Sequence, residues 1–385
     1  MSAALRQSEL TIRTCILYEV LDKKPIKQSF DNFRRKVGND VISYYEFEFW
    51  FYRFNNGNHD LHYDRSVNPV PRLLSGMPLN VINEVLNHLD LIDLIALMKV
   101  SRNFRRAVQN MKVCVIESLV VQLFEETDCT KIIYNLRYKF EYRQNDAGCE
   151  VTFFARNGDI FEKQKVVAGG NYIELCNKDL KLMVESGKAQ MELFRLDNKG
   201  IQKKSRKKFI AGIEKALNSA KNLSSKTVQT QFVSYPELAQ LLPIFPAEKL
   251  KKLILNGLDG REYEQLIDLD QWKKARIFQG FEGELNVPIE HFLHFEWLDV
   301  HLATFTDEDA MKLRDMIDRS AHFVYAEIQY TRMNIDRLKR VFDVHSVEHN
   351  HIYETPDKRS FYVAFGQFMI QITKPGYQFD YNYKL

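Results

Sequence analysis

The sequence predicts an α+β protein with several domains: an N-terminal helical module, a segment of three helices, and a C-terminal α/β region with strand–helix repeats. Apolar residues recur at helical spacing up to about residue 110, and strand and helix patterns are mixed after about Val115. The 385 residues are 45% hydrophobic, with only 16 glycines and 10 prolines, so the chain has enough material for buried cores and should be mostly ordered. We expect the boundaries at 1–68, 69–115 and 116–385.

The charge balance argues against several function classes. The 54 Lys and Arg residues nearly equal the 51 Asp and Glu residues, and a net charge of +3 gives no global field that would hold the chain on nucleic acid or a membrane. Arg6 and Glu9 interrupt any signal peptide, and no stretch approaches the roughly 18 apolar residues that span a bilayer. We therefore expect a soluble cytoplasmic or nuclear protein. Five widely spaced cysteines without a C-x-x-C pair suit a reducing compartment: Cys15, Cys114, Cys129, Cys149 and Cys176.

Three short helices are expected between Thr11 and Phe54. The second begins near Pro25 and stops before Gly38-Asn39, and the third starts after Ser43, a suitable N-cap. Their apolar faces consist of Ile12, Ile16, Leu17, Val20, Phe30, Phe33, Val37, Phe47, Trp50, Phe51 and Phe54.

Three more helices should follow a boundary near Asn68–Arg72, where Pro69 and Pro71 favour extended chain. Pro78 suits a first helical turn, Asp90 and Asp93 bracket the next start, and Ser101 can cap a third helix. The apolar positions at helical spacing are Leu79, Ile82, Val85, Leu86 and Leu89, then Leu94, Leu97 and Met98, then Phe104, Ala107 and Val108.

The region after Val115 should contain a sheet. Arg137–Arg143 and Glu150–Ala155 surround a turn at Asn145–Gly148 and predict a β-hairpin. Leu182–Glu185 and Met191–Leu196 are expected to be further strands.

Four apolar triplets in the C-terminal part predict strand–helix repeats. They begin at residues 250, 272, 295 and 323, at a spacing of 22 to 28 residues typical of a leucine-rich-repeat-like horseshoe. A helix is expected after the capping-box-like Thr306–Asp309. The asparagine typical of such repeats is absent, because Leu258 occupies its position, so an ordinary α/β layer stays open as an alternative. The triplets are Leu250, Leu253 and Leu255; Trp272, Ala275 and Ile277; Phe295, Leu298 and Val300; and Phe323, Ala326 and Ile328.

The stretch Met77–Phe104 resembles an F-box. The resemblance rests on the proline that opens the first helix, the apolar pattern after it, the Leu94–Leu97 pair, and Val100-Ser101-Arg102 followed by Phe104. Many F-boxes carry cysteine where this chain has Ser101. These helices expose more apolar surface than so short a segment can bury, which implies a partner, unless they form a helical hairpin in some larger core. In the family that partner is a Skp-type adaptor, which bridges to a cullin. The resemblance places these residues at or behind the adaptor interface: Pro78, Leu79, Ile82, Leu86, Leu97 and Val100.

The region Arg13–Ser66 resembles the N-terminal helix-turn-helix module of mariner-type transposases. The matching residues are Arg13–Glu19, Trp50–Phe54, Gly57, Asp60-Leu61 and Asp64–Ser66. Those relatives bind DNA with the third helix in the major groove. Here that helix offers Glu46 and Glu48, with Arg53 its clear cation, and carboxylates are repelled by phosphates. We therefore expect a protein-interaction module rather than a DNA-binding one.

The order of these modules is similar to the nematode F-box A class. Its C-terminal half, the FTH or DUF38 homology region, is taken to bind targets. The resemblance implies a substrate-recognition subunit of an SCF-type cullin ubiquitin ligase. Two alternatives stay open: a transposase-derived DNA-binding regulator, and an F-box scaffold that acts outside ubiquitin transfer.

No enzyme site, cofactor site or metal site is expected. No nucleophile stands with a base, and Gly280–Gly283 lacks the Gly-Lys-Ser/Thr of a P-loop. The basic run Lys203–Lys208 is best interpreted as a solvated loop or helix face, with a nuclear localisation patch or a nucleic-acid contact as the alternatives. His345, His349 and His351 with Glu348 lack the cysteine or further histidine that would specify zinc.

The strand residues between the apolar triplets should form a target surface. If residues 250–330 stack as repeats, these residues face outward and form a patch rich in aromatic and charged groups. They are Lys252, Ile254, Lys274, Arg276, Trp297, Asp299, Tyr325 and Glu327. Arg276, Trp297 and Tyr325 are the expected target-binding residues.

Overall fold

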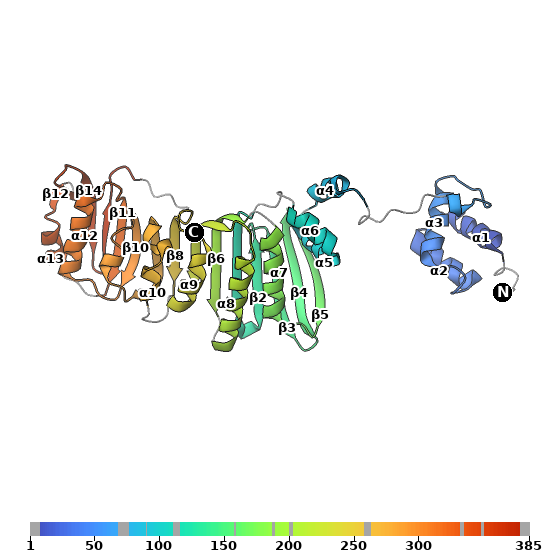
Figure 1. Ribbon diagram of the computed structural model, residues 1–385, viewed down its shortest axis with the longest axis horizontal. Helices are drawn as coiled ribbons and strands as arrows, with labels where there is room; N and C mark the ends of the chain where they lie inside the picture. The colour runs from blue at the N-terminus through green and yellow to red at the C-terminus, as the bar shows by residue number, and fades with distance from the viewer. Residues whose placement is uncertain are drawn as a thin grey trace. The chain divides into compact units, whose positions relative to one another are not determined.

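A computed structural model describes residues 8–67, 77–89, 91–110, 116–157, 159–186, 189–199, 203–257, 263–331, 335–347 and 350–377. It divides the chain into two compact units, Met1–Gly76 and Met77–Leu385. The first unit is helical, and the second combines helices with a large mixed sheet (Figure 1). The prediction of an α+β protein with several domains is confirmed.

The first unit contains the three predicted helices, α1 (Glu9–Leu21), α2 (Ile26–Val37) and α3 (Tyr44–Asn55), followed by the 3₁₀ turn η2 (Arg65–Val67). Ser43 caps α3, since its Oγ accepts a hydrogen bond from the Glu46 amide at 3.2 Å. Gly38 ends α2 with a φ of +135°, which favours glycine. The predicted apolar faces meet in one core, whose buried members are Ile16, Val20, Phe33, Val37, Phe47, Trp50, Phe51 and Phe54.

The second unit begins with α4 (Leu79–Asn87), α5 (Leu91–Val100) and α6 (Arg102–Asn110). The Ser101 Oγ accepts a hydrogen bond from the Phe104 amide at 3.2 Å, which confirms the predicted cap. Leu94, Met98 and Val108 are buried, as their helical spacing predicts. The predicted boundary at Pro69 and Pro71, like Asp90, lies outside the described residues.

The three-helix segment packs on α7 (Tyr172–Ser186), far along the chain. Lys99 on α5 donates a hydrogen bond from Nζ to Asp179 Oδ2 on α7 at 2.9 Å, and the Tyr142 hydroxyl donates to the same oxygen at 3.0 Å. Asp179 is buried. This ion pair therefore ties the segment to the C-terminal region.

The fifteen described strands form one sheet in the order β12-β13-β14-β15-β11-β10-β9-β8-β7-β6-β1-β2-β3-β4-β5. Strands β1 and β6 to β11 are parallel neighbours, and antiparallel meanders, β2 to β5 and β12 to β15, lie on either side. The strands are β1 (Ser118–Phe124), β2 (Cys129–Tyr134), β3 (Tyr138–Asn145), β4 (Gly148–Asn157), β5 (Asp159–Ala168), β6 (Gln190–Lys199), β7 (Ser224–Gln231), β8 (Lys252–Asn256), β9 (Ile277–Leu285), β10 (Trp297–Leu302), β11 (Tyr325–Tyr330), β12 (His345–Val347), β13 (Asn350–Glu354), β14 (Ser360–Gly366) and β15 (Met369–Thr373).

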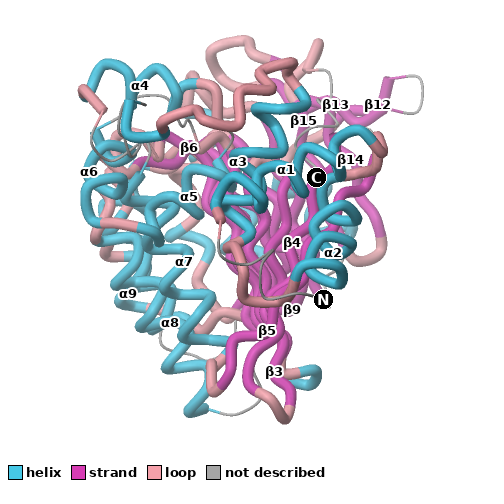
Figure 2. Tube along the Cα trace, turned by 90° about the vertical axis from the view of Figure 1, so that its right-hand side faces the viewer, coloured by secondary structure: helices cyan, strands magenta, loops and turns pink. Residues whose placement is uncertain are grey.

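Helices connect the parallel strands and, as α7, α8 and α9 show, lie along one face of the sheet (Figure 2). The predicted capping box is present at Thr306, whose Oγ1 accepts a hydrogen bond from the Asp309 amide at 3.2 Å. The helices after α7 are α8 (Lys203–Asn218), α9 (Tyr235–Leu241), α10 (Glu264–Ile267), α11 (Asp270–Lys274), α12 (Asp307–Arg319) and α13 (Ile335–Val341); the 3₁₀ turns are η4 (Glu125–Thr127), η5 (Leu242–Ile244) and η6 (Ile289–His291).

The sheet confirms the predicted hairpin, formed by β3 and β4, and the strand at Met191–Leu196, which lies in β6. The predicted strand at Leu182–Glu185 is wrong, because these residues belong to α7. A short apolar run does not separate a buried strand from a buried helix. The prediction overlooked the helix N-cap at Asn171. Its Oδ1 accepts a hydrogen bond from the Glu174 amide at 3.2 Å and so stabilises the start of α7.

The strand register corrects one of the four predicted triplets. Leu253, Phe278, Leu298 and Ala326 are aligned across β8, β9, β10 and β11. The second triplet is therefore Ala275, Phe278 and Gly280, three residues later than predicted. Trp272 lies in α11 instead, with its ring 5.2 Å from that of Phe278. The correct triplet could not be recognised in the sequence, because Gly280 supplies no apolar side chain at the position where the other strands have one.

Three cysteines are buried in the sheet region: Cys129, Cys149 and Cys176. Burial raises the pKa of the Cys176 thiol to about 12 and the pKa values of the Cys129 and Cys149 thiols to about 11. At pH 8 a thiol with a pKa near 11 is only about 0.1% thiolate, the reactive form. Intact-mass measurement after iodoacetamide treatment should show no more than two adducts on the folded chain and five in guanidinium chloride. Three or more adducts on the folded chain would contradict this packing.

Candidate functional sites

The predicted adaptor residues divide into a buried group and an accessible group. Ile82 and Leu86 on α4 are only 6% and 1% exposed, and α4 packs against α6. Pro78 and Val100 are exposed, and Leu97 is half-buried. The side chain of Leu79 lies outside the described part of the structure. Ile82 and Leu86 therefore support the helices rather than offer surface to a partner.

Two valines that the adaptor prediction did not include are accessible on α4. Val81 and Val85 are one helical turn apart and exposed, and Val100 at the end of α5 is 72% exposed. Apolar residues occur on both sides of α4 in the sequence, so the pattern alone does not tell which side packs on α6. The accessible apolar set, which we call the valine patch, is Val81, Val85 and Val100.

The alternate residues of the parallel strands face away from the helices. Trp272 of α11 packs on Phe278, so the next residue, Gln279, lies on the opposite side of the sheet, which we call the far face. The register aligns Gln279 with Ile254, Asp299 and Glu327 across four strands. A second aligned row of this face consists of Lys252, Ile277, Trp297 and Tyr325.

Trp297 and Tyr325 lie on the far face but are covered. Their rings stack with centroids 4.8 Å apart, and Tyr377 stacks on Tyr325 at 6.5 Å. Trp297 is 3% exposed and Tyr325 is 1% exposed. In this structure the two rings form a packed layer and offer little area to a partner.

Arg276 and Lys274 are not strand residues, which corrects the prediction for both. Arg276 directly precedes β9, and Lys274 ends α11, because the second repeat starts three residues later than its apolar pattern indicated. Ile277 and Gln279 occupy the aligned positions instead. The Arg276 side chain is nevertheless exposed, and its Nε donates a hydrogen bond to Glu296 Oε1 at 2.6 Å.

Hydrogen bonds on the far face join β11 to β15. The Tyr325 hydroxyl donates to Glu327 Oε2 at 2.6 Å, and Gln371 Nε2 donates to the Tyr325 hydroxyl at 2.9 Å. Burial, with the neighbouring Glu327 carboxylate, raises the pKa of Tyr325 far above its usual value, so the phenol stays protonated. Sequence reasoning missed Gln279 and Gln371, because the first needs the corrected register and the second comes from an antiparallel strand outside the repeats.

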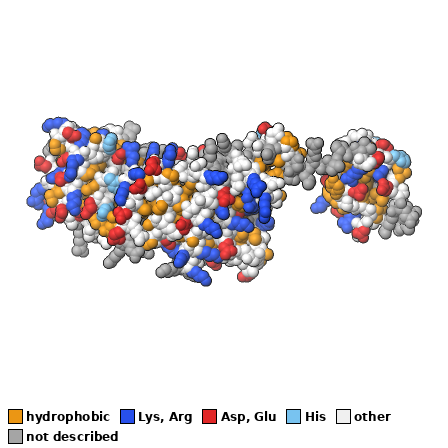
Figure 3. Space-filling view, in the orientation of Figure 1, with side chains coloured by type: hydrophobic (Ala, Val, Ile, Leu, Met, Phe, Trp, Pro, Cys, Tyr) orange, Lys and Arg blue, Asp and Glu red, His pale blue; other side chains and the backbone are white. Residues whose placement is uncertain are grey.

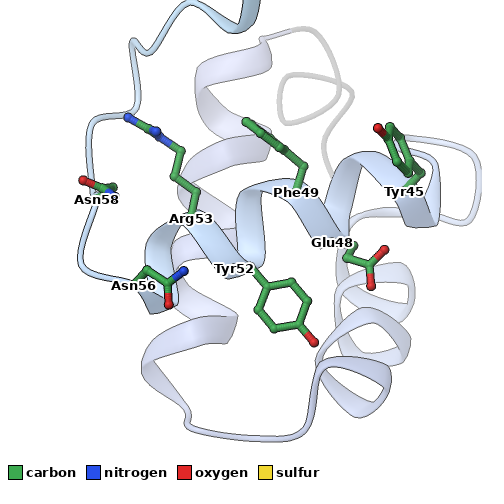
Figure 4. Close-up of a pocket in the computed structure, with 7 residues that line it drawn as sticks. All are labelled: Tyr45, Glu48, Phe49, Tyr52, Arg53, Asn56 and Asn58. Atoms are coloured by element: carbon green, nitrogen blue, oxygen red, sulfur yellow. The ribbon is translucent and has the colours of Figure 1, made fainter. Parts of the chain in front are cut away.

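The outer side of α3 carries a shallow groove of about 390 Å³ (Figure 4). Phe49 and Arg53 line one side of it, and Glu48 and Tyr52 line the other. The groove residues are Tyr45, Glu48, Phe49, Tyr52, Arg53, Asn56 and Asn58.

Arginines at this groove stack on aromatic rings. The Arg53 guanidinium lies 3.4 Å from the ring centroid of Tyr63, and Arg65 lies 4.4 Å from that of Phe49. Arg65 also forms an ion pair with Glu46 at 3.8 Å. These contacts hold the cations against the protein, away from any phosphate backbone.

Comparison with known proteins gives three domain matches. An F-box domain model matches residues 74–115, an FTH domain model matches residues 207–345, and a model of the HTH domain in Mos1 transposase matches residues 10–58. F-box A protein 224 of Caenorhabditis elegans is 35% identical over 384 residues, which cover 97% of this chain and 98% of that protein. The chain belongs to the F-box A family. The resemblance inferred from its modules is confirmed.

The three domains of this F-box A chain correspond to separate parts of the fold. The helix-turn-helix match covers α1 to α3, and the F-box match covers α4 to α6. The FTH match runs from α8 to the start of β12 and includes parallel strands β7 to β11. The valine patch therefore lies in the F-box, and the far face of β8 to β11 lies in the FTH domain.

The basic run of this F-box A chain forms the start of α8. Arg206 is structural: its Nη2 lies 2.6 Å from Glu237 Oε2 on α9 and donates to the Phe232 carbonyl at 2.9 Å. Lys208 pairs with Glu174 at 2.8 Å. Figure 3 shows acidic and basic side chains interspersed over much of the visible face of the second unit. The run is thus partly tied into the fold.

The described part of the F-box A chain contains neither a cluster of metal-ligating side chains nor a membrane-spanning helix. No group of three or more His, Cys, Asp or Glu side chains there could hold a metal ion. Glu348 and His349 of the histidine cluster lie outside the described residues. No helix among the residues searched is long and apolar enough to span a bilayer.

Duplex DNA should bind this F-box A chain no more tightly than about 10⁻⁴ M at physiological salt, the weak limit of non-specific binding. Glu46 and Glu48 lie on the helix that would enter the groove, and Arg53 and Arg65 stack on rings. Fluorescence anisotropy with labelled duplexes at several salt concentrations measures the dissociation constant and its salt dependence. Tight binding with a steep salt dependence would instead favour the DNA-binding regulator.

Proposed function

We propose that this chain is a non-catalytic substrate-recognition subunit of an SCF-type cullin ubiquitin ligase. The F-box would bind a Skp-type adaptor and, through it, a cullin, while the FTH domain holds a target near the ubiquitin-loading machinery. Rate enhancement would then come from proximity rather than from chemistry by this chain. Such a subunit would act in the cytoplasm, the nucleus or both.

The observation that carries the adaptor proposal is the valine patch. Val81, Val85 and Val100 are exposed within one short helical segment, and the F-box domain model matches the same residues. Apolar side chains left exposed on a domain can bury their surface against a partner. Pro78 and Leu97 would extend the contact, while Ile82 and Leu86 would hold the helices in place behind it; Leu79, expected there by resemblance, completes the proposed set.

We propose the far face as the target surface. Consecutive parallel strands linked by helices, as in leucine-rich repeats, place aligned rows of side chains on one side of a sheet. Arg276, exposed directly before β9, would contact the target beside this face. Trp297 and Tyr325, expected as target-binding residues from the sequence, are covered by packing in this structure and would support the surface from within rather than touch the target, whereas arginine is a residue type that dominates binding energy in interfaces.

Capture of interacting proteins tests both parts of the proposal. The full chain, expressed with proteasome inhibition and analysed by quantitative mass spectrometry, should recover the adaptor, a cullin and a set of further proteins. Arg276→Glu should lose some of those further proteins by at least about tenfold, because it reverses a charge in a contact. Lys273→Glu, an exposed charge reversal on α11, is the matched control and should lose none.

Three outcomes of this capture separate the alternatives. Adaptor recovered without a cullin would favour the F-box scaffold acting outside ubiquitin transfer. Equal recovery of every protein by the Arg276→Glu variant would exclude Arg276 from the target surface. Loss of the adaptor by that variant would show that the substitution damages the second unit as a whole.

A further inference from the structure

Several side chains of the far face are buried although they point away from the connecting helices. Ile254 and Asp299 are each 4% exposed, Trp297 is 3% exposed, and Gln279 is 0% exposed. Helix α11 packs on the opposite side of the sheet, so it does not cover them. A solvated sheet face leaves its polar side chains accessible. The burial of Gln279 and Asp299 therefore indicates that a further segment of the chain lies over this face.

Gln279 needs a hydrogen-bond partner from that segment. Its side-chain Oε1 and Nε2 are both buried, and neither makes a hydrogen bond among the described residues. Such a buried amide costs about 1–3 kcal/mol, so the covering segment should carry polar groups. The neighbouring Glu327 shows which group suits this face, because its Oε2 accepts a hydrogen bond from the Tyr325 hydroxyl at 2.6 Å. Tyrosine supplies both a ring to cover apolar neighbours and a hydroxyl for the polar ones.

The chain reaches the far face at Tyr377, whose ring stacks on that of Tyr325. The next eight residues contain an aromatic residue at every second position, namely Phe379, Tyr381 and Tyr383. In an extended chain alternate side chains point to the same side, so these three rings would lie on the same side as Tyr377. The opposite side of the same segment consists of Gln378, Asp380, Asn382 and Lys384.

This segment is long enough to cross the covered strands. Alternate side chains of an extended chain are about 6.6 Å apart, so Tyr381 would lie about 13 Å beyond Tyr377. Strand β8 lies three strands from β11, which is about 14 Å. A path from β11 to β8 passes Asp299 on β10 and Gln279 on β9 before it reaches Ile254.

We propose that residues 378–385 lie extended across the far face of β8 to β11, with their aromatic side chains directed at the sheet. The rings would cover Trp297, and the tyrosine hydroxyls would bind the Gln279 amide and the Asp299 carboxylate. The segment continues the stack that Tyr377 begins on Tyr325.

The segment would then be an internal competitor for the surface proposed for targets, a consequence that rests on the proposed function. A target must displace residues 378–385 to reach the far face, so its apparent affinity falls by the fraction of chains in which the segment is released. A target segment that takes this place should share its chemistry. We therefore expect an extended peptide with aromatic side chains at alternate positions.

Photo-crosslinking of the full chain tests where the segment lies, independently of any target. The probe p-benzoylphenylalanine in place of Tyr381 keeps an aromatic side chain directed at the sheet, and it should crosslink within one chain to β8, β9 or β10. The same probe in place of Asn382, which belongs to the opposite side of the segment, is the matched control and should crosslink to these strands at least about tenfold less. Mass spectrometry of tryptic peptides locates the crosslinks. Equal yields at the two positions, or no crosslink from position 381 to these strands, would overturn the proposal.

Target capture tests the competition separately. In the full chain, Tyr381→Ser together with Tyr383→Ser removes two rings that hold the segment, and it should raise target recovery at least about threefold. Asp380→Ser together with Asn382→Ser alters the opposite side and should leave recovery unchanged; thermal melting checks that both double variants are folded. Equal recovery by the two double variants would show that the segment does not compete with targets. Crosslinks from position 381 without capture of a target by any of these chains would leave the segment in place and overturn the proposed function instead.

Discussion

Val100→Asp should abolish adaptor binding and leave the chain folded. Val100 is 72% exposed at the end of α5, so an aspartate there has water around it in the free protein. In the proposed complex the carboxylate would lose that water without gaining a partner, which costs about 3 kcal/mol or roughly a 150-fold loss of affinity. Isothermal titration calorimetry of the purified chain with a Skp-type adaptor measures this loss of affinity.

Two substitutions show whether the loss belongs to the valine patch. Met311→Asp on α12 also places a carboxylate at an exposed apolar position, far along the chain, and should leave adaptor affinity unchanged. Ile82→Asp should also lose the adaptor, but through unfolding of the F-box, because Ile82 is buried. Unchanged affinity of a folded Val100→Asp variant would remove Val100 from the adaptor interface.

Lys99→Met should destabilise the second unit by about 2 kcal/mol. The substitution leaves the Asp179 carboxylate buried, with the Tyr142 hydroxyl as its remaining hydrogen-bond partner at 3.0 Å. The expected destabilisation lies below the roughly 3–5 kcal/mol typical of broken buried pairs, because the Lys99 side chain is 45% exposed and solvent screens its charge. Urea unfolding of the full chain, followed by circular dichroism, gives the change in midpoint.

A double-mutant cycle isolates the interaction between these two residues. Asp179→Asn removes the charge but keeps an acceptor for Tyr142, so it should cost only about 1 kcal/mol. The Lys99→Met/Asp179→Asn chain should be more stable than the Lys99→Met chain, since no buried charge is left unpaired. Lys178→Met, at an exposed position of α7, should change stability by less than about 0.5 kcal/mol. An equal effect of Lys99→Met and Lys178→Met would contradict the structural role of the pair.

The helices of the first 110 residues could be predicted because their signals are local. Ser43 and Ser101 cap helices within three residues of themselves, and the apolar spacing around Phe47 and Leu94 gives the buried faces directly. The F-box and the family followed from the same short-range patterns. The accessible side of α4 could not be predicted from such short-range patterns, because the contact between α4 and α6 determines which side is buried.

The candidate target surface was harder to predict because it depends on register. A shift of three residues in one strand moves side chains to the other face of a sheet, and Gly280 removed the apolar residue that would have fixed the second repeat. Trp297 is covered by Tyr325, on which Tyr377 stacks in turn, and both tyrosines lie far along the chain from Trp297. The Lys99–Asp179 pair joins residues 80 positions apart, a distance at which sequence spacing carries no signal.

Because the F-box packs on α7, the distance from the F-box to any point on the sheet can be counted in strands. Helix α7 packs on β2 and β3, and β8 lies four strands beyond β2 while β11 lies seven beyond it. At about 4.8 Å per strand, a target segment bound over β8 would sit roughly 19 Å along the sheet from β2, and one over β11 roughly 34 Å. The strand that a target occupies would therefore decide which of its lysines comes within range of the ubiquitin donor.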